Sequence, residues 1–122
     1  MAKKSTKESL YENFSQEIRR GVLVLAVLSQ LSEPQYGYSL KQRLHEKGLE
    51  INEGTLYPLL RRLESQGLLQ SSWEVVNDTR PRRYYQISDQ GQTIHSHLIQ
   101  DWENMIDVMS ELLAKEPHQK DL

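Results

Sequence analysis

The sequence predicts a mainly α-helical fold with one β-hairpin, and three observations support this. Leucine-rich segments in the first half carry apolar residues at the 3.6-residue spacing of helices. Over residues 68–87 the apolar spacing changes to the alternation typical of strands, on both sides of a polar turn. Residues 88–114 then carry apolar residues at heptad spacing, which indicates a long helix that packs on another.

The composition of the 122-residue chain excludes several classes of protein. It has no cysteine, which excludes disulfide scaffolds, thiolate zinc sites and cysteine nucleophiles. Its longest apolar run, Gly21–Leu28, falls far short of the ~20 residues of a membrane span. Nothing near Met1 resembles a signal peptide, so we expect a cytoplasmic protein without a membrane partner.

The charge is unevenly distributed along the chain. Residues 1–35 carry a net charge of +1, residues 36–85 a net charge of +2, and residues 86–122 a net charge of −5. The middle of the chain is therefore suited to face an anion, whereas the C-terminal part is not.

The first part of the chain is predicted to be an arm followed by a helix. Residues 1–14 are polar and basic, and we expect a flexible N-terminal arm that either frays or touches DNA phosphates. Ser15 to Leu31 is predicted to be helical, with Ser15 as its N-cap. From Ile18 onward its apolar residues cover nearly the whole helix, which is typical of a helix sandwiched between layers. Pro34 ends this helix.

Two shorter helices follow. Tyr38 to Lys47 is predicted to be the second, with Gly48 at the left-handed position after its end. The third is expected to begin at the N-cap Asn52 and to run to about Gln66, with Pro58 near its first turn. One apolar stripe faces inward from this third helix and consists of Leu56, Leu59, Leu60 and Leu63.

A hairpin and a last helix complete the predicted fold. Strands are expected over Leu68–Val75 and Arg83–Ile87, joined by the polar turn Asn77–Pro81. Ser88 is the predicted N-cap of a helix that extends to about Ala114 and serves dimerisation. Residues 115–122 are expected to be a disordered tail. The expected dimer interface consists of Leu98, Trp102, Met105, Ile106, Met109, Leu112 and Leu113.

Three helices followed by a hairpin is the order of a winged helix-turn-helix, with the DNA-binding domain over residues 15–87 and the hairpin as its wing. Guanidinium groups bind phosphates or guanine edges through paired hydrogen bonds, and the first turn of a helix attracts phosphate. The candidate DNA-binding residues are Tyr38, Ser39 and Lys41 in the second helix, Asn52, Glu53, Gly54, Thr55, Tyr57, Pro58 and Arg61 in the third, and Arg80, Arg82 and Arg83 in the hairpin.

The same residues also admit simpler interpretations. Arg61 and Arg62 are also typical of a solvated helix surface, on which Arg61 pairs with Glu64. The hairpin arginines are also compatible with an ordinary soluble hairpin that does not bind DNA. Tyr36, Tyr84 and Tyr85 are more typical of structural residues than of ligand-binding ones. A winged-helix module that docks proteins without binding DNA is therefore the alternative function.

The sequence resembles the PadR family of bacterial transcription regulators. The resemblance is carried by Tyr36-Gly37-Tyr38, by EGTLYPLLRRLE at residues 53–64 and by PRRYY at residues 81–85, and it covers about Ile18 to Leu113. It implies a homodimer that binds an imperfect palindrome in double-stranded DNA and usually represses transcription. The hairpin turn departs from the family pattern because it contains no glycine.

The single C-terminal helix is similar to that of the short PadR subfamily, which includes the multidrug-binding regulator LmrR. In that subfamily a tryptophan on the last helix stacks on planar aromatic drugs between the two subunits. The resemblance implies a planar aromatic effector for this chain, with Trp102, Asp101 and Met105 as candidate ligand-binding residues. The alternative is that Trp102 and Met105 belong to the core of a dimer interface, where methionine at helical spacing usually lies.

Metal and catalytic sites are not expected. His95 and His97 lie two positions apart on a helix, so they point to different faces and are unsuited to chelate a metal together. The sequence contains no Gly-rich phosphate loop and no nucleophile elbow, so we expect neither a cofactor nor an enzyme.

Overall fold

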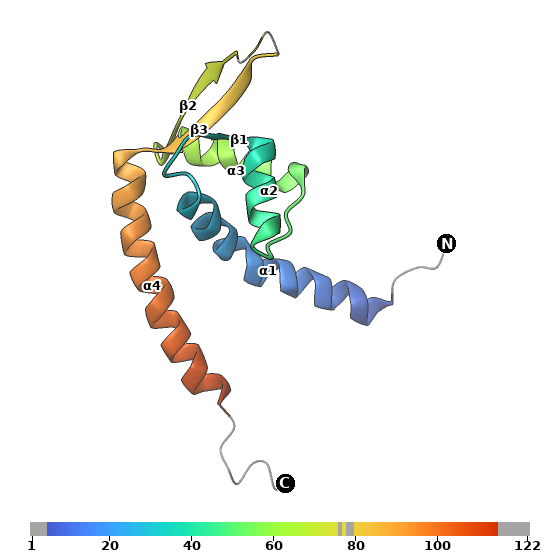
Figure 1. The fold of residues 1–122 in the computed structure, drawn as a ribbon. Helices are drawn as coiled ribbons and strands as arrows, with labels where there is room; N and C mark the ends of the chain where they lie inside the picture. The colour runs from blue at the N-terminus through green and yellow to red at the C-terminus, as the bar shows by residue number, and fades with distance from the viewer. Residues whose placement is uncertain (1–4, 76, 78–79, 115–122) are drawn as a thin grey trace, which may run out of the picture.

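The computed structural model describes residues 5–75, 77 and 80–114 and confirms the mainly helical fold with a hairpin (Figure 1). The described helices are α1 (Thr6–Ser29), α2 (Gly37–Glu46), α3 (Glu53–Ser65) and α4 (Asp89–Leu113). The strands are β1 (Gln35–Tyr36), β2 (Leu69–Glu74) and β3 (Arg82–Ile87). The predicted disordered tail, residues 115–122, lies outside the described residues.

Helix α1 begins much earlier than the sequence analysis predicted. The N-cap is Ser5, whose hydroxyl oxygen accepts a hydrogen bond from the backbone N–H of Glu8 at 3.0 Å. The predictions of an N-cap at Ser15 and of a flexible arm through residue 14 are therefore wrong for residues 6–14, which are helical. Residues 1–4 of the predicted arm lie outside the described residues.

Only the second half of α1 belongs to the core. Leu23, Val27 and Leu28 are buried, whereas Ile18 is 76% exposed. The first half of the helix projects away from the rest of the chain (Figure 1). The expectation of a helix sandwiched along its whole length is therefore wrong, because nothing in the described chain packs on both sides of the first half.

Helices α2 and α3 follow the predicted pattern closely. The side chain of Asn52 accepts a hydrogen bond from the backbone N–H of Thr55 at 2.9 Å, as expected of an N-cap. Gly48 has a φ of +96°, a left-handed conformation that glycine adopts without steric cost. Of the predicted leucine stripe on α3, Leu59 is only half-buried and the other three leucines are buried.

The sheet has three strands in the order β1-β3-β2, all antiparallel. The two-residue strand β1 was not predicted; it pairs with β3 in the register Tyr36↔Tyr84. In the hairpin, Trp73 lies opposite Arg83 and Leu69 lies opposite Ile87. The wing is therefore joined by β1 directly to the start of α2.

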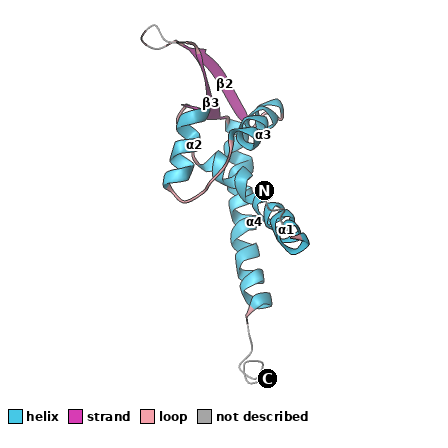
Figure 2. Cartoon of the chain, turned by 90° about the vertical axis from the view of Figure 1, so that its right-hand side faces the viewer, coloured by secondary structure: helices cyan, strands magenta, loops and turns pink. Residues whose placement is uncertain are grey.

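Helix α4 leaves the core after its first turns. Ser88 caps it by accepting a hydrogen bond from the backbone N–H of Gly91 at 2.9 Å, as predicted. Leu98 packs on the core, but from Ile99 to the end every described residue is exposed. Both views show this part of α4 extending away from the body (Figures 1 and 2). No helix in the described part of the chain is long and apolar enough to cross a membrane.

Candidate nucleic-acid interface

The first turn of α3 presents polar groups to solvent. The buried residues Leu56, Leu60 and Leu63 fix one face of the helix in the core. The exposed surface of α3 and of its N-cap includes six of the candidates from the sequence: Asn52, Glu53, Gly54, Thr55, Pro58 and Arg61. Backbone N–H groups at a helix start also attract anions. This surface can therefore approach a duplex without disturbing the core.

Tyr57 differs from these neighbours because it is half-buried against α2. A Cβ atom at Gly37 would lie only 2.1 Å from Cε1 of Tyr57, so the ring rests on the glycine itself. Burial, followed by the negative charge of Glu53, raises the pKa of the Tyr57 hydroxyl above its ordinary value. Tyr57 thus links the start of α2 to the exposed face of α3.

The three candidate DNA-binding residues at the start of α2 differ in their contacts and in their exposure to solvent. The hydroxyl of Ser39 donates a hydrogen bond to the backbone carbonyl of Tyr36 at 3.0 Å and is half-buried. Tyr38 is exposed, and its hydroxyl accepts a hydrogen bond from Gln42 at 2.8 Å. Lys41 Nζ lies 3.9 Å from a carboxylate oxygen of Glu53, which brings the two helices together at this surface. Tyr38 is the exposed candidate of α2, and the side chain of the half-buried Lys41 is still 36% exposed.

An aromatic cluster connects the wing to this surface. The ring of Tyr36 stacks on the ring of Tyr38, with 6.4 Å between the ring centroids. It packs edge-to-face on the ring of Tyr84, with 5.6 Å between the centroids. The guanidinium of Arg82 lies over the Tyr36 ring, 4.4 Å from its centroid. Arg82 is exposed and leans toward α2, so one wing arginine lies beside the candidates of that helix. Tyr36 and Tyr84 are structural here, as the sequence indicated.

Arg83 lies in a different environment from Arg82. Its guanidinium forms an ion pair with Glu64 of α3, with Nη2 2.6 Å from Oε1. The sequence offered Glu64 as a partner of Arg61, but the structure pairs it with Arg83. Arg61 is exposed on the surface of α3.

Arg80, the remaining wing candidate, is exposed next to the turn. Within that turn, Asn77 has a φ of +54°, a left-handed conformation that asparagine adopts more readily than most other residues with a side chain. Asn77 therefore gives the described part of this turn a left-handed residue other than glycine. Residues 76, 78 and 79 of the predicted turn lie outside the described residues.

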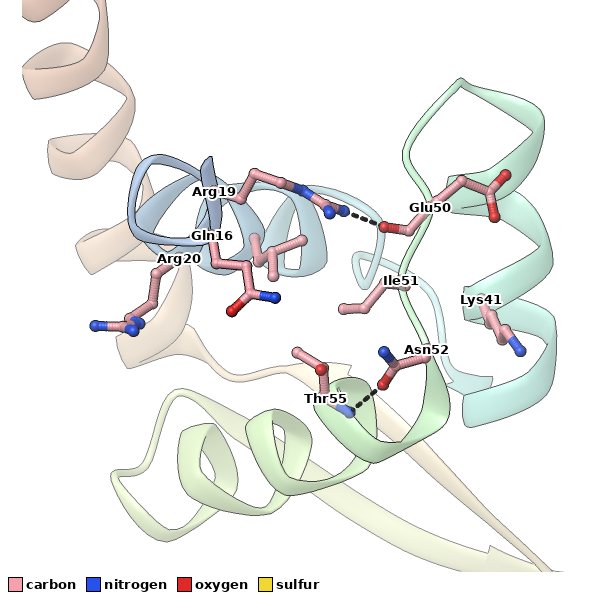
Figure 3. Close-up of a pocket in the computed structure, with 9 residues that line it drawn as sticks. Gln16, Arg19, Arg20, Lys41, Glu50, Ile51, Asn52 and Thr55 are labelled. Atoms are coloured by element: carbon pink, nitrogen blue, oxygen red, sulfur yellow. Dashed lines mark hydrogen bonds between the residues drawn. The ribbon is translucent and has the colours of Figure 1, made fainter. Parts of the chain in front are cut away.

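A hollow of about 570 Å³ opens between α1, α2 and the start of α3 (Figure 3). Arg19 donates a hydrogen bond to the backbone carbonyl of Glu50, which ties α1 to the segment before α3. Arg20 and Lys41 lie on opposite sides of the hollow and do not converge on one point (Figure 3). The Arg19–Glu50 hydrogen bond at its rim therefore links α1 to the segment that leads into α3.

Large apolar side chains are exposed on α4 and on the first half of α1. On α4 they include six of the seven residues of the predicted dimer interface, Leu98 being half-buried against the core of its own chain. On α1 they are Ile18, which was expected to be buried, and three residues that were not predicted although their helical spacing was a signal for them: Leu10, Tyr11 and Phe14. Exposed apolar patches of this kind are typical of interaction surfaces.

Residues 24–96 match the family model described as transcriptional regulator PadR-like. The chain belongs to the PadR-like family of transcriptional regulators. A PadR family regulator from Eggerthella lenta has a crystal structure with a TM-score of 0.80 and 42% identity, over 90% of this chain and 97% of that one. A PadR-like regulator from Bacillus cereus has a TM-score of 0.72 and 30% identity, over 82% and 99%. Transcriptional regulator Rv3488 of Mycobacterium tuberculosis is 34% identical over 103 residues, which are 84% of this chain and 92% of that protein.

Members of the PadR family are transcriptional regulators and not enzymes, and DNA is their partner. The winged-helix fold agrees with this function. The matched segment begins in the second half of α1 and ends in the first turns of α4. The described residues also contain no cluster of three or more side chains suited to hold a metal ion.

Proposed function

We propose that this PadR-like regulator binds an imperfect palindrome as a homodimer and represses transcription from it. In this proposal α3 enters the major groove, while Tyr38 and Lys41 of α2 and the wing arginines Arg80 and Arg82 contact the flanking backbone. Thr55 and Tyr57 read base edges or orient α3 against them. The observation that carries the proposal is the uncovered apolar face on α1 and α4, which a second copy of the chain would bury.

The uncovered face supports a partner that is the same chain. The apolar residues on α4 repeat at heptad spacing, which suits a helix of the same kind, and those on α1 provide a second uncovered apolar surface. Helix α4 also carries acidic residues and no lysine or arginine, so it is unsuited to DNA. A homodimer would present two α3 helices, as a palindrome requires.

DNA binding is tested with the promoter of the regulator's own gene by fluorescence anisotropy at several salt concentrations. We expect tight binding at low salt that weakens steeply as salt rises. Lys41→Ala removes one phosphate contact per subunit, so the slope of log K against log[salt] should fall by about 1.8 in the dimer. Lys47→Ala, at the other end of α2, is the matched control and should leave the slope unchanged.

Sequence reading is tested separately from phosphate binding. Thr55→Ala should change the preference among operator variants, whereas Lys41→Ala should weaken binding to all of them alike. A wild-type protein that ignores promoter DNA even at low salt would contradict the proposal. That result would favour the alternative function, in which the wing docks a protein.

The dimer is tested by light scattering at micromolar concentration. Met105→Asp introduces a charge into the uncovered face and should shift the protein to monomers. Gln100→Asp introduces the same residue on another face of α4 and should remain dimeric. A wild-type monomer would remove the argument for two half-sites.

We further propose that a planar aromatic effector binds beside Trp102 at the dimer interface and relieves repression. Trp102 is 39% exposed in the single chain, so the core of its own chain leaves the ring available for stacking. Asp101 and Met105 lie on the neighbouring surface of α4 and would supply negative charge and adaptable packing. The cationic dye proflavine should quench tryptophan fluorescence, and Trp102→Ala should abolish this. The measurement is made in a Trp73→Phe background, and quenching that survives Trp102→Ala would contradict the site.

A further inference from the structure

We propose that Arg83 is a positioning residue that fixes the wing to α3 through Glu64 and does not contact DNA. This inference rests on the proposed function, because its main test uses DNA binding. It assigns opposite roles to the two adjacent arginines of the wing strand. Arg82 remains available to contact the phosphate backbone, and Arg83 determines the position of the wing relative to α3.

The two arginines point to opposite faces of β3 because successive side chains of a strand alternate. Arg83 shares its face with Tyr85 and Ile87, which are both buried in the core. Arg82 shares the other face with Tyr84 and lies over the ring of Tyr36. An arginine on the core face can approach DNA only by leaving the contacts that the core offers it.

Those contacts form a closed cluster of three side chains. Arg83 donates from Nη2 to Oε1 of Glu64 at 2.6 Å and from Nε to the hydroxyl of Ser71 at 3.1 Å. The Ser71 hydroxyl donates in turn to the other carboxylate oxygen of Glu64. Both carboxylate oxygens of Glu64 are therefore occupied, and the cluster joins α3, β2 and β3 at one point.

Burial and aromatic neighbours strengthen this cluster. The side chains of Arg83 and Glu64 are only 35% and 26% exposed, so water screens their attraction less than that of a surface pair. The guanidinium also lies 5.5 Å from the centroid of the Tyr85 ring and 5.8 Å from that of Trp73. The charge of Glu64 offsets that of Arg83, so the pair adds little net attraction for phosphate.

The cluster matters for DNA binding because α3 and the wing must reach the duplex together. Glu64 lies at the end of α3 farthest from Asn52, where the helix meets the base of the hairpin (Figure 1). Freeing the wing at this point would leave the individual DNA contacts intact but no longer held in one geometry. Binding would then include the cost of ordering the wing.

The test compares Arg82→Gln, Arg83→Gln and Glu64→Gln in the same salt series. Arg82→Gln should lower the slope of log K against log[salt] by about 1.8 per dimer. Arg83→Gln should weaken binding roughly tenfold while the slope stays at the wild-type value. Glu64→Gln should also weaken binding, although it removes a negative charge from the protein.

A direct contact between Arg83 and phosphate predicts the opposite results. Arg83→Gln would then reduce the slope as Arg82→Gln does, and Glu64→Gln would tighten binding by freeing Arg83. Either observation would overturn the proposal. The double exchange Glu64→Arg with Arg83→Glu separates the models further. It should recover binding relative to Arg83→Glu alone if the pair positions the wing, and should not if Arg83 contacts DNA.

A measurement without DNA distinguishes failure of this inference from failure of the proposed function. Hydrogen exchange of the β2 and β3 amides should be faster in Glu64→Gln than in the wild type, with α1 unchanged as internal reference. Unchanged exchange in the hairpin would overturn the positioning role whether or not the protein binds DNA. If the wild-type protein fails to bind DNA but Glu64→Gln still speeds exchange in the hairpin, only the proposed function is overturned.

Discussion

The ring of Tyr57 lies against the Cα of Gly37, so closely that a Cβ atom there would stand 2.1 Å from Cε1 of the ring. Gly37 opens α2, and Tyr57 belongs to the α3 segment proposed to read DNA. The glycine is therefore required by the close approach of two helices. It couples the start of α2 to the orientation of a recognition residue.

Gly37→Ala should accordingly weaken DNA binding and also lower stability. The methyl group displaces the Tyr57 ring, and overpacking of this kind costs about 1–3 kcal/mol of unfolding free energy. Urea denaturation measures the stability, and anisotropy with promoter DNA measures the affinity. Gly21→Ala is the matched control: a Cβ there meets nothing within 4 Å, so it should stabilise α1 by roughly 0.5–1 kcal/mol. If Gly37→Ala has the same stability and DNA affinity as the wild type, the start of α2 does not control the orientation of Tyr57.

Gly91→Ala should destabilise the protein more than Gly37→Ala. A Cβ at Gly91 would lie 2.1 Å from the backbone carbonyl oxygen of Leu68 and 2.8 Å from Cγ1 of Ile87. A carbonyl within the core cannot move aside as a tyrosine ring can, so the first turn of α4 must shift. We expect a loss of about 3 kcal/mol or more in urea denaturation. A smaller loss than that of Gly37→Ala would show that α4 is not held closely at this point.

Ser88→Ala should lower the unfolding free energy by about 1–2 kcal/mol. The Ser88 hydroxyl accepts from Gly91 N–H at 2.9 Å and donates to the carbonyl of Gly67 at 2.6 Å, so it caps α4 and joins it to the α3–β2 connection. Ser5→Ala is the comparison, because Ser5 caps α1 through a hydrogen bond from Glu8 N–H at an exposed end of the helix. Thermal denaturation of both variants should show a smaller loss of unfolding free energy for Ser5→Ala than for Ser88→Ala. Equal losses would contradict the role of Ser88 in joining α4 to the α3–β2 connection.

The helices that form the core were predictable because each has a local signal. The leucine stripe of α3 and the caps at Asn52 and Ser88 determine which faces turn inward, and the residues left over form the candidate interface. The start of α1 had such a signal as well. Ser5 and Glu8 have the spacing of a capping box, but the basic composition of residues 1–14 favoured a flexible arm.

The features that were missed depend on contacts between distant parts of the chain. Strand β1 has two residues and exists because β3 offers it an open edge, which no local pattern reveals. The different roles of Arg82 and Arg83 follow from strand alternation once the core face of β3 is known. The choice of Glu64 as partner of Arg83 required the packing of α3 on the hairpin, since the two residues are 19 positions apart.

Alkaline pH should reveal the burial of Tyr85. Tyr85 is only 7% exposed to solvent. Burial raises its pKa, Glu64 raises it further, and the positive charges of Arg83 and Arg61 lower it in part. In the unfolded chain a tyrosine titrates near pH 10, so above about pH 10 the unfolded state loses this proton while the folded state keeps it.

The unfolded state then binds fewer protons than the folded state, so the unfolding free energy must fall as pH rises. The contribution of Tyr85 is fully present below about pH 10 and is lost as pH rises toward the raised pKa of the folded protein. Urea denaturation from pH 8 to 11 should show this fall, at up to about 1.4 kcal/mol per pH unit for each such group. Tyr57, whose pKa is also raised, contributes in the same direction. Tyr85→Phe should make the fall shallower, whereas Tyr38→Phe, at an exposed ring outside the proposed dimer face, is the matched control. An equally steep fall in Tyr85→Phe would contradict this assignment and leave the alkaline loss to Tyr57 and other groups.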